Sequence, residues 1–233
     1  MKRKTVKLLC SIIPVSSWRK KMRKKLVFNY VLSKEEREKV MRDQALYSSV
    51  MDLVDENCVC IDCGANTGQE TIPWAKKGAE VHAFEPHPEC FRILKEKTTR
   101  FSKVHLYQKG VWHKNSTMNL YLREGSGVSD ISESSSLLKS KPNVDAESYV
   151  TVEIIDLVEF IKGLNKRVDI LKIDIEGAEV ELVQKIIDTA IYKEIGLILV
   201  ETHEQIEEIS EEIQRLRTLV SELGIDNINM EWR

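Results

Sequence analysis

Short, nearly continuous apolar runs alternate with amphipathic segments along most of this chain. Such runs are typical of strands buried on both faces, whereas amphipathic segments are typical of helices that lie on a sheet. Strands that alternate with helices predict a mostly parallel, doubly wound sheet with helices on both faces, which is an α/β, Rossmann-like fold. The expected strands are residues 54–61, 80–84, 104–110, 118–122, 151–155, 168–173, 195–200 and 225–232, and the expected helices are residues 35–50, 69–77, 87–100, 156–164 and 206–223.

A glycine-containing turn directly follows the first apolar run, and it consists of Asp62, Gly64, Ala65, Asn66 and Gly68 with the residues between them. Gly64 allows a tight reversal, and Gly68 lets the backbone approach a ligand at the start of a helix. A loop that binds a dinucleotide has a further glycine where Asn66 stands. The spacing therefore favours a ligand without a pyrophosphate, one with a cationic amino-acid head and an adenosine, such as S-adenosylmethionine (SAM).

Acidic residues follow the later strands. Glu85 and Pro86 end the run 80–84, where a carboxylate is placed to accept hydrogen bonds from both hydroxyls of a ribose. Asp174 and Glu176 follow the run 168–173 in the same way. Ligands of open α/β sheets bind outside the carboxyl ends of the strands, so these acids and the glycine turn are expected to share one crevice.

Four linked segments resemble the FkbM-type SAM-dependent methyltransferases. The resemblance implies a class I methyltransferase fold and methylation of an oxygen, commonly on a sugar or a polyketide-like product. It also implies that Gly110 and Val111 lie beside the adenine. The segments that carry it are Asp62-x-Gly64-Ala65-Asn66-x-Gly68, Phe84-Glu85-Pro86, Lys172-Ile173-Asp174-Ile175-Glu176-Gly177-Ala178-Glu179 and Glu201-x-His203.

The candidate catalytic residues are Asp174, Glu176 and His203. Methyl transfer from a sulfonium requires alignment of the acceptor oxygen and removal of its proton. Asp174 or His203 is expected to be the base, and Glu176 to position the acceptor, although His203 at a strand end equally fits a capping or packing role. No metal site is predicted, because the spacing of Asp174, Glu201 and His203 is not diagnostic, but these side chains offer ligands for a divalent metal.

Charge is distributed unevenly along the chain. Eleven of the 35 basic residues lie in residues 1–34, which contain no acid, so all 37 acidic residues lie in the remainder. Trp18, Met22 and Leu26 are spaced by four among these lysines and arginines, which predicts a basic amphipathic helix within a helical extension of residues 1–45. Peripheral contact with an anionic membrane through residues 1–30, contact with a partner, and packing on the domain all fit this pattern. Nucleic acid is not expected as a partner, because no platform of aromatic and basic residues accompanies the charge.

The remaining residues, 46–233, are expected to form the SAM-binding domain. Within it, residues 123–148 are rich in serine and glycine and show no period, which predicts a mobile loop that is either a disordered insertion or a lid on the acceptor side. Five cysteines without secretory features indicate reduced thiols and a cytoplasmic protein. Cys58 and Cys60 would share one face of a strand, so packing is favoured over a metal site with Cys63.

The function that these features predict is a SAM-dependent O-methyltransferase acting on a sugar hydroxyl of a glycan or glycolipid precursor, in polysaccharide biosynthesis at the inner face of a membrane. The glycan acceptor follows from the family resemblance and the basic N-terminal segment. A nicotinamide-dependent oxidoreductase is one alternative, and a non-catalytic SAM-binding module at the membrane is another. The sequence does not indicate the oligomeric state.

Overall fold

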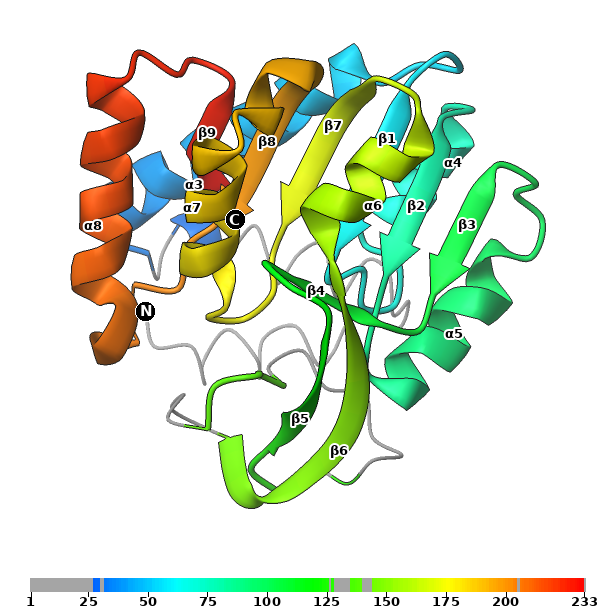
Figure 1. The fold of residues 1–233 in the computed structure, drawn as a ribbon. Coiled ribbons are helices and arrows are strands. Elements are labelled where there is room, and N and C mark those ends of the chain that lie inside the picture. Colours follow the sequence, from blue (N-terminus) through cyan, green and yellow to red (C-terminus); the bar gives the residue numbers. More distant parts are fainter. Residues whose placement is uncertain are drawn as a thin grey trace. The chain divides into compact units, whose positions relative to one another are not determined.

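The computed structural model describes residues 27–29, 32–125, 127, 135–139, 144–204 and 206–232 (Figure 1). The chain forms two compact units, Met1–Met51 and Asp52–Arg233. The predicted basic amphipathic helix with Trp18, Met22 and Leu26 lies outside the described residues. In the part of the chain that the structure describes, no helix has both the length and the apolar character needed to cross a membrane.

The second unit is built on a six-stranded sheet in which every pair of neighbouring strands is parallel. The strand order is β3-β2-β1-β7-β8-β9, so the chain starts near the middle, moves to one edge and then continues on the other side of β1. This reversal confirms the predicted α/β, doubly wound fold. The strands are β1 (Val59–Cys63), β2 (Glu80–Phe84), β3 (Val104–Tyr107), β7 (Val168–Ile173), β8 (Ile195–Glu201) and β9 (Ile228–Trp232).

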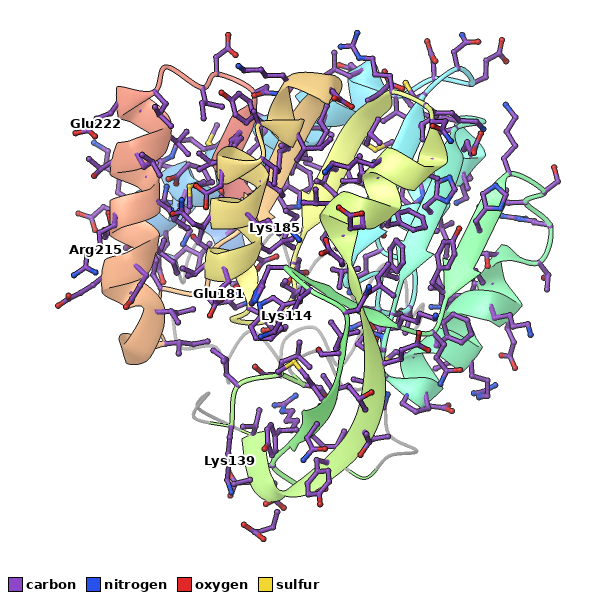
Figure 2. The ribbon with its side chains drawn as sticks, in the orientation of Figure 1. Lys114, Lys139, Glu181, Lys185, Arg215 and Glu222 are labelled. Carbon is purple, nitrogen blue, oxygen red and sulfur yellow. The ribbon has the colours of Figure 1, made fainter. Side chains whose placement is uncertain are left out.

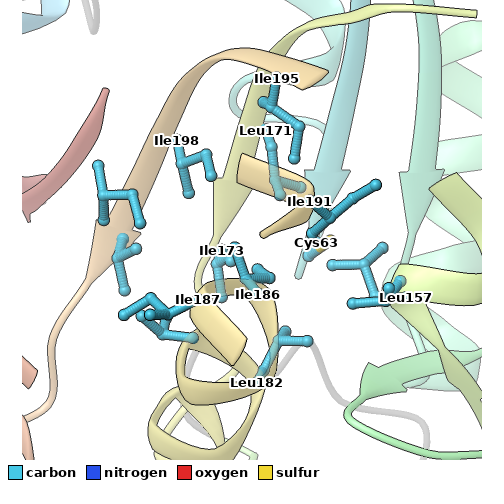
Figure 3. Close-up of a cluster of buried hydrophobic side chains, with 14 of the residues drawn as sticks. Cys63, Leu157, Leu171, Ile173, Leu182, Ile186, Ile187, Ile191, Ile195 and Ile198 are labelled. Atoms are coloured by element: carbon cyan, nitrogen blue, oxygen red, sulfur yellow. The ribbon is translucent and has the colours of Figure 1, made fainter. Parts of the chain in front are cut away.

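Helices cover both faces of this sheet. One face carries α6 (Leu157–Leu164), α7 (Glu179–Asp188) and α8 (Glu207–Glu222), with the short 3-10 helix η1 (Ile191–Glu194) between α7 and β8. Their apolar side chains form the main core with alternate residues of the strands, as Figure 3 shows for Leu157, Leu182 and Ile186 against Leu171 and Ile173. The helices α4 (Thr71–Lys76) and α5 (Pro88–Thr98) contribute none of the residues of this core, because they pack on the opposite face.

Helix α8 follows the apolar period that the sequence shows. Ile213, Leu216 and Val220 are buried in the main core. On the solvent side of α8, Arg215 and Glu222 point away from the sheet in Figure 2. The helix therefore closes one side of the domain by a single apolar stripe.

A second, smaller sheet was not predicted. It has the order β4-β6-β5, formed by β4 (Gly110–Trp112), β5 (Ser116–Arg123) and β6 (Val144–Asp156). Figure 1 shows β5 and β6 as a long ribbon that extends past the carboxyl ends of the parallel strands. Its inner face packs Leu120, Val152 and Ile154 against Leu137 and Ala178. This places a wall beside the edge of the main sheet where ligands are expected.

Helix α3 (Lys34–Leu53) begins in the first unit, one residue before its predicted start. The Ser33 hydroxyl accepts a hydrogen bond from the Glu36 amide at 3.1 Å, and the Glu36 carboxylate accepts one from the Ser33 amide at 2.6 Å. This reciprocal capping box satisfies backbone donors at the start of the helix.

Among the expected elements that differ in their limits are the first strand, the run 104–110 and the loop 123–148. The first strand begins at Val59, because residues 54–58 form a turn in which Asp55 accepts hydrogen bonds from Asn57 and Cys58. The run 104–110 is divided between β3 and β4, which belong to different sheets. Part of the predicted loop 123–148 is strand, because β6 already pairs Val144 with Arg123 of β5. Residues 126, 128–134 and 140–143 of that loop lie outside the described residues.

Candidate active site

A cavity of about 250 Å³ lies at the carboxyl ends of the parallel strands, beside the smaller sheet. Of the residues predicted to bind a cofactor, Asp62 and Gly68 do not line it, and of the predicted catalytic residues His203 does not. The sequence-predicted residues in its wall are Gly64, Ala65, Asn66, Glu85, Pro86, Gly110, Val111, Asp174 and Glu176. Most of the predicted residues therefore meet at one crevice.

The turn after β1 requires glycine at position 64. Gly64 has a φ of +80°, and a Cβ atom there would lie 1.8 Å from the carbonyl oxygen of Asp174. The backbone amides of Gly64 and Ala65 both donate to the carbonyl oxygen of Phe84, at 3.0 and 2.9 Å. The turn thus ties the ends of β1, β2 and β7 together and exposes its own backbone to the cavity.

Glu85 is held rigidly at one end of the cavity. Its carboxylate accepts hydrogen bonds from the backbone amides of Asn66 and His87, each at 2.7 Å. Burial raises the pKa of Glu85 to about 7, although both hydrogen bonds favour the charged form. Next to it, the Nε2 atom of the buried His87 side chain has no hydrogen-bond partner among the described residues, while Nδ1 accepts from the Cys90 amide. This end of the cavity therefore offers a carboxylate acceptor and an imidazole N–H donor.

A buried lysine lies beneath the turn. The ammonium of Lys172 contacts Asp174 Oδ2 at 3.0 Å and Asp62 Oδ1 at 3.4 Å, and donates to the carbonyl oxygen of Gly64 at 3.0 Å. Burial alone would lower the pKa of Lys172, but the carboxylates of Asp174 and Asp62 more than offset burial and raise it. The other oxygen of Asp62 accepts from the amide and hydroxyl of Thr71 at the start of α4. Asp62 therefore supports the turn from behind and does not face the cavity.

Gly68 has a similar supporting role. Its φ is +92°, and a Cβ atom there would lie within 3.0 Å of the side chains of Ile72 and Leu94. Glycine at this position lets the turn pack closely on α4 and α5.

The other end of the cavity is acidic. Asp174, Glu176 and Glu201 line it, and burial together with the nearby Asp174 carboxylate raises the pKa of Glu201. Behind them His203 is clamped between two carboxylates, with Nε2 2.9 Å from Glu176 Oε2 and Nδ1 2.9 Å from Glu179 Oε1. Burial alone would lower the pKa of His203, but hydrogen bonds to Glu176 and Glu179 raise it to about 10. Both ring nitrogens are engaged, so the imidazole supports the acidic wall from behind.

The backbone at Glu176 is held in an uncommon conformation. Its φ is +59°, which L-residues rarely adopt. The Ser136 hydroxyl donates to the Glu176 carbonyl oxygen at 2.5 Å, and the buried Glu179 carboxylate accepts from the amides of Ile175 and Gly177. Ser135 and Leu137 line the cavity too, so part of the segment predicted as an acceptor-side loop forms its wall.

Sequence reasoning did not assign roles to Lys172 and Glu179 and treated Glu201 only as an alternative metal ligand. A signal for Lys172 was present, because it is the only basic residue in the apolar run 168–173. A long cation in a buried strand needs an anionic partner, and Asp62 and Asp174 are at strand ends. Glu179 gives no comparable signal, since an acid in the first turn of a helix is common.

The chain matches the family model of the methyltransferase FkbM domain over residues 62–225. No curated protein matches the chain. The chain is also similar to several solved structures, of which three follow. TYW2 of Pyrococcus horikoshii in complex with MeSAdo is 21% identical with a TM-score of 0.25, covering 27% of this chain and 25% of that chain.

The other two matches cover more of each chain. An rRNA methylase of Streptococcus thermophilus is 9% identical with a TM-score of 0.40, covering 72% of this chain and 76% of that chain. SMU.1697c of Streptococcus mutans, solved in complex with SAH, is 11% identical with a TM-score of 0.44, covering 75% and 80%.

Replacing the glycine of the turn is expected to disrupt the domain. In Gly64→Ala the added Cβ would overlap the backbone of Asp174, so we expect a loss of more than about 4 kcal/mol in the free energy of unfolding. Urea unfolding followed by circular dichroism measures this loss. Gly163→Ala is the matched control, because outside the adjoining part of α6 no atom of the described residues lies within 4 Å of the added Cβ, and alanine favours a helix. A Gly64→Ala protein as stable as wild type would contradict the close approach.

Removing the buried ammonium is expected to leave Asp62 charged and uncompensated. We expect Lys172→Met to lower the free energy of unfolding by about 3–5 kcal/mol. Lys166→Met, which removes an exposed lysine paired with Glu80, should change it by about 0–1 kcal/mol. Chemical denaturation measures both changes. If the two substitutions lower the free energy of unfolding equally, the contacts of Lys172 with Asp62 and Asp174 are not needed for stability.

Proposed function

The chain belongs to the FkbM methyltransferase domain family, and from that premise we propose that it transfers the methyl group of SAM to a sugar hydroxyl of a glycan or glycolipid precursor. Membership confirms the resemblance seen in the sequence and implies SAM as the cofactor. The oxygen acceptor, its glycan nature and the location at a membrane are proposals. The observation that supports them best is a cavity with a nucleoside-compatible end and an acidic end.

The first end of the cavity fits the adenosine and amino-acid parts of SAM. Each oxygen of the Glu85 carboxylate accepts one backbone amide and keeps a lone pair for a ribose hydroxyl. The buried Nε2 of His87 is a donor that a polar atom of a bound ligand would satisfy. Gly110 and Val111 add an apolar wall from β4 beside Pro86. These residues would therefore hold the adenosine.

The second end fits a neutral acceptor with several hydroxyls. When bound, SAM supplies a methyl group that its sulfonium already activates. The chain has to align the acceptor oxygen and to accept its proton. Asp174 lines the cavity and is the base that we favour, since both nitrogens of His203 are already engaged. Glu176 and Glu201 would orient neighbouring hydroxyls, and this row of carboxylates would repel an anionic acceptor.

The basic N-terminal segment supports a reaction near a lipid surface. Residues 1–34 contain eleven basic residues and no acid, and such a segment is attracted to anionic lipid headgroups. We propose peripheral contact with the inner face of a membrane through residues 1–30, where the protein would meet a lipid-linked precursor. Binding to vesicles with and without anionic lipid, compared with a variant lacking residues 1–30, tests this contact.

Methyl transfer can be tested with labelled SAM. Incubation of the full chain with a cell-envelope extract should place label in a glycan or glycolipid fraction. Asp174→Asn should lower the rate by about 100-fold or more, since it removes the base. It should leave binding of S-adenosylhomocysteine (SAH) within a few-fold of wild type. Label confined to protein or RNA would reject the glycan acceptor, and calorimetry without any heat for SAM or SAH would reject the enzyme itself.

Glu85 should make cofactor binding depend on pH. Only its ionised form accepts two hydroxyls, and burial raises its pKa to about 7. We therefore expect SAH affinity to be constant above pH 8 and to fall as the pH drops below about 7, because binding must then release the proton from Glu85. Calorimetry between pH 5.5 and 8.5 measures this. Glu85→Gln should bind about 10- to 100-fold more weakly at pH 8 and lose the dependence, whereas Glu96→Gln, at an exposed position of α5, should behave as wild type.

A further inference from the structure

The loop after β7 and the end of β8 bring one imidazole and two carboxylates together. His203 Nε2 lies 2.9 Å from Glu176 Oε2 and 3.9 Å from Asp174 Oδ1. One ligand atom from each residue lies within 4.8 Å of the other two. Adjacent ligands of an octahedral cation are about 3.0 Å apart, so small side-chain shifts suffice for coordination. We propose that Asp174, Glu176 and His203 bind a divalent cation at the acceptor end of the cavity.

The surroundings orient His203 as a metal ligand. Its Nδ1 atom lies 2.9 Å from Oε1 of Glu179, a carboxylate that is itself buried and fixed by the backbone amides of Ile175 and Gly177. Without a cation, the proton on Nε2 lies between His203 and Glu176. A bound cation would displace this proton, and the N–H at Nδ1 would still donate to Glu179, so that the lone pair of Nε2 would be directed at the ion. A carboxylate that holds the far nitrogen of a histidine is the usual outer-shell arrangement of metal sites.

Asp174 is oriented in a similar manner. Its Oδ2 atom is paired with the Lys172 ammonium at 3.0 Å, and the other oxygen, Oδ1, is the one nearer His203. One oxygen is thus held by the protein while the second remains directed at the cluster. Glu176 supplies the third ligand from a backbone conformation that Ser136 holds through the Glu176 carbonyl.

The ligand set indicates the class of cation. Two carboxylates and one imidazole without a thiolate suit an oxygen-preferring first-row ion such as Mn²⁺. Asp174 and Glu176 line the cavity whereas His203 lies behind it, so the open positions of the ion would face the acceptor. There it would bind hydroxyl oxygens of the acceptor and lower their pKa. This use in methyl transfer rests on the proposed function, but cation binding does not.

A second group of ligating side chains must be separated from this one in any test. Glu80, His82 and His105 also bring ligand atoms within 4.8 Å of one another, at strand positions away from the cavity. Glu80 is already paired with Lys166 at 2.8 Å. His105→Ala removes this second group without touching the cavity, and it serves as the background for the experiment.

Mn²⁺ binding to the metal-free full chain can be followed by the loss of the electron paramagnetic resonance signal of free Mn²⁺, together with the shift in Tm. We expect His105→Ala to bind one Mn²⁺ and to gain thermal stability. Adding Glu176→Gln or Asp174→Asn should weaken binding by at least about 10-fold and abolish the shift. His203→Gln should do the same, and if it fails to fold, the two carboxylate variants decide.

Three outcomes would overturn the proposal. The first is that the protein binds no Mn²⁺ at 1 mM. The second is that Glu176→Gln leaves Mn²⁺ binding unchanged, and the third is that His105→Ala abolishes it. SAH calorimetry on the same preparations keeps the proposed function separate. SAH binding without Mn²⁺ binding would contradict only the proposed cation site. Mn²⁺ binding without SAH binding would contradict only the proposed methyltransferase function.

Discussion

The position of one buried ammonium determines how this cavity is built. Lys172 contacts Asp62 on β1, Asp174 after β7 and the carbonyl of Gly64 in the turn between β1 and α4. Without a cation, two carboxylates at neighbouring strand ends would repel each other in a region from which water is largely excluded. With the cation, the turn and the loop after β7 approach so closely that only glycine fits at position 64. Such a cluster adds little to net stability, but its geometry leaves few alternative arrangements.

The two ends of the cavity use different physical means of recognition. Around Glu85 the protein offers one carboxylate and the imidazole N–H of His87, and backbone amides of the turn and of the start of α5 hold the carboxylate in place. At the other end the recognition groups are the carboxylates of Asp174 and Glu176. The surrounding residues Glu179, His203 and Ser136 hold this end in place. The first end is therefore pre-formed by the sheet. The second depends on contacts between segments that are distant in the sequence.

This difference explains what the sequence could predict. Each strand of the main sheet is one apolar run, so the parallel sheet was visible in the pattern of residues. Parallel strands end at one edge, which is why the turn, Glu85, Asp174 and Glu176 were correctly expected to meet. Asp62 was predicted to bind the ligand. In the structure Ile61 and Cys63 face the main core. Because side chains alternate between the two faces of a strand, Asp62 points to the opposite face, toward α4.

The smaller sheet and the clamp on His203 could not be predicted in the same way. Strands were expected at 118–122 and 151–155, but the pairing of Gly110 with Ile154 was not, and Val144 pairs with Arg123 in a stretch expected to be a loop. Those pairings depend on packing against Ala178 and Leu137, which local periodicity does not encode. The partners of His203 depend likewise on the neighbouring positions of β7 and β8, which only the strand order reveals.

The separate origin of the two walls bears on how such proteins diversify. The parallel sheet and its loops supply Glu85, Asp174, Glu176 and Glu201, whereas Leu120 of β5 together with Ser135 and Leu137 adds a separate part of the lining. Insertions and substitutions in the ribbon leave the hydrogen bonds of the sheet intact. Selectivity for new acceptors can therefore evolve in the ribbon while the cofactor machinery is inherited unchanged.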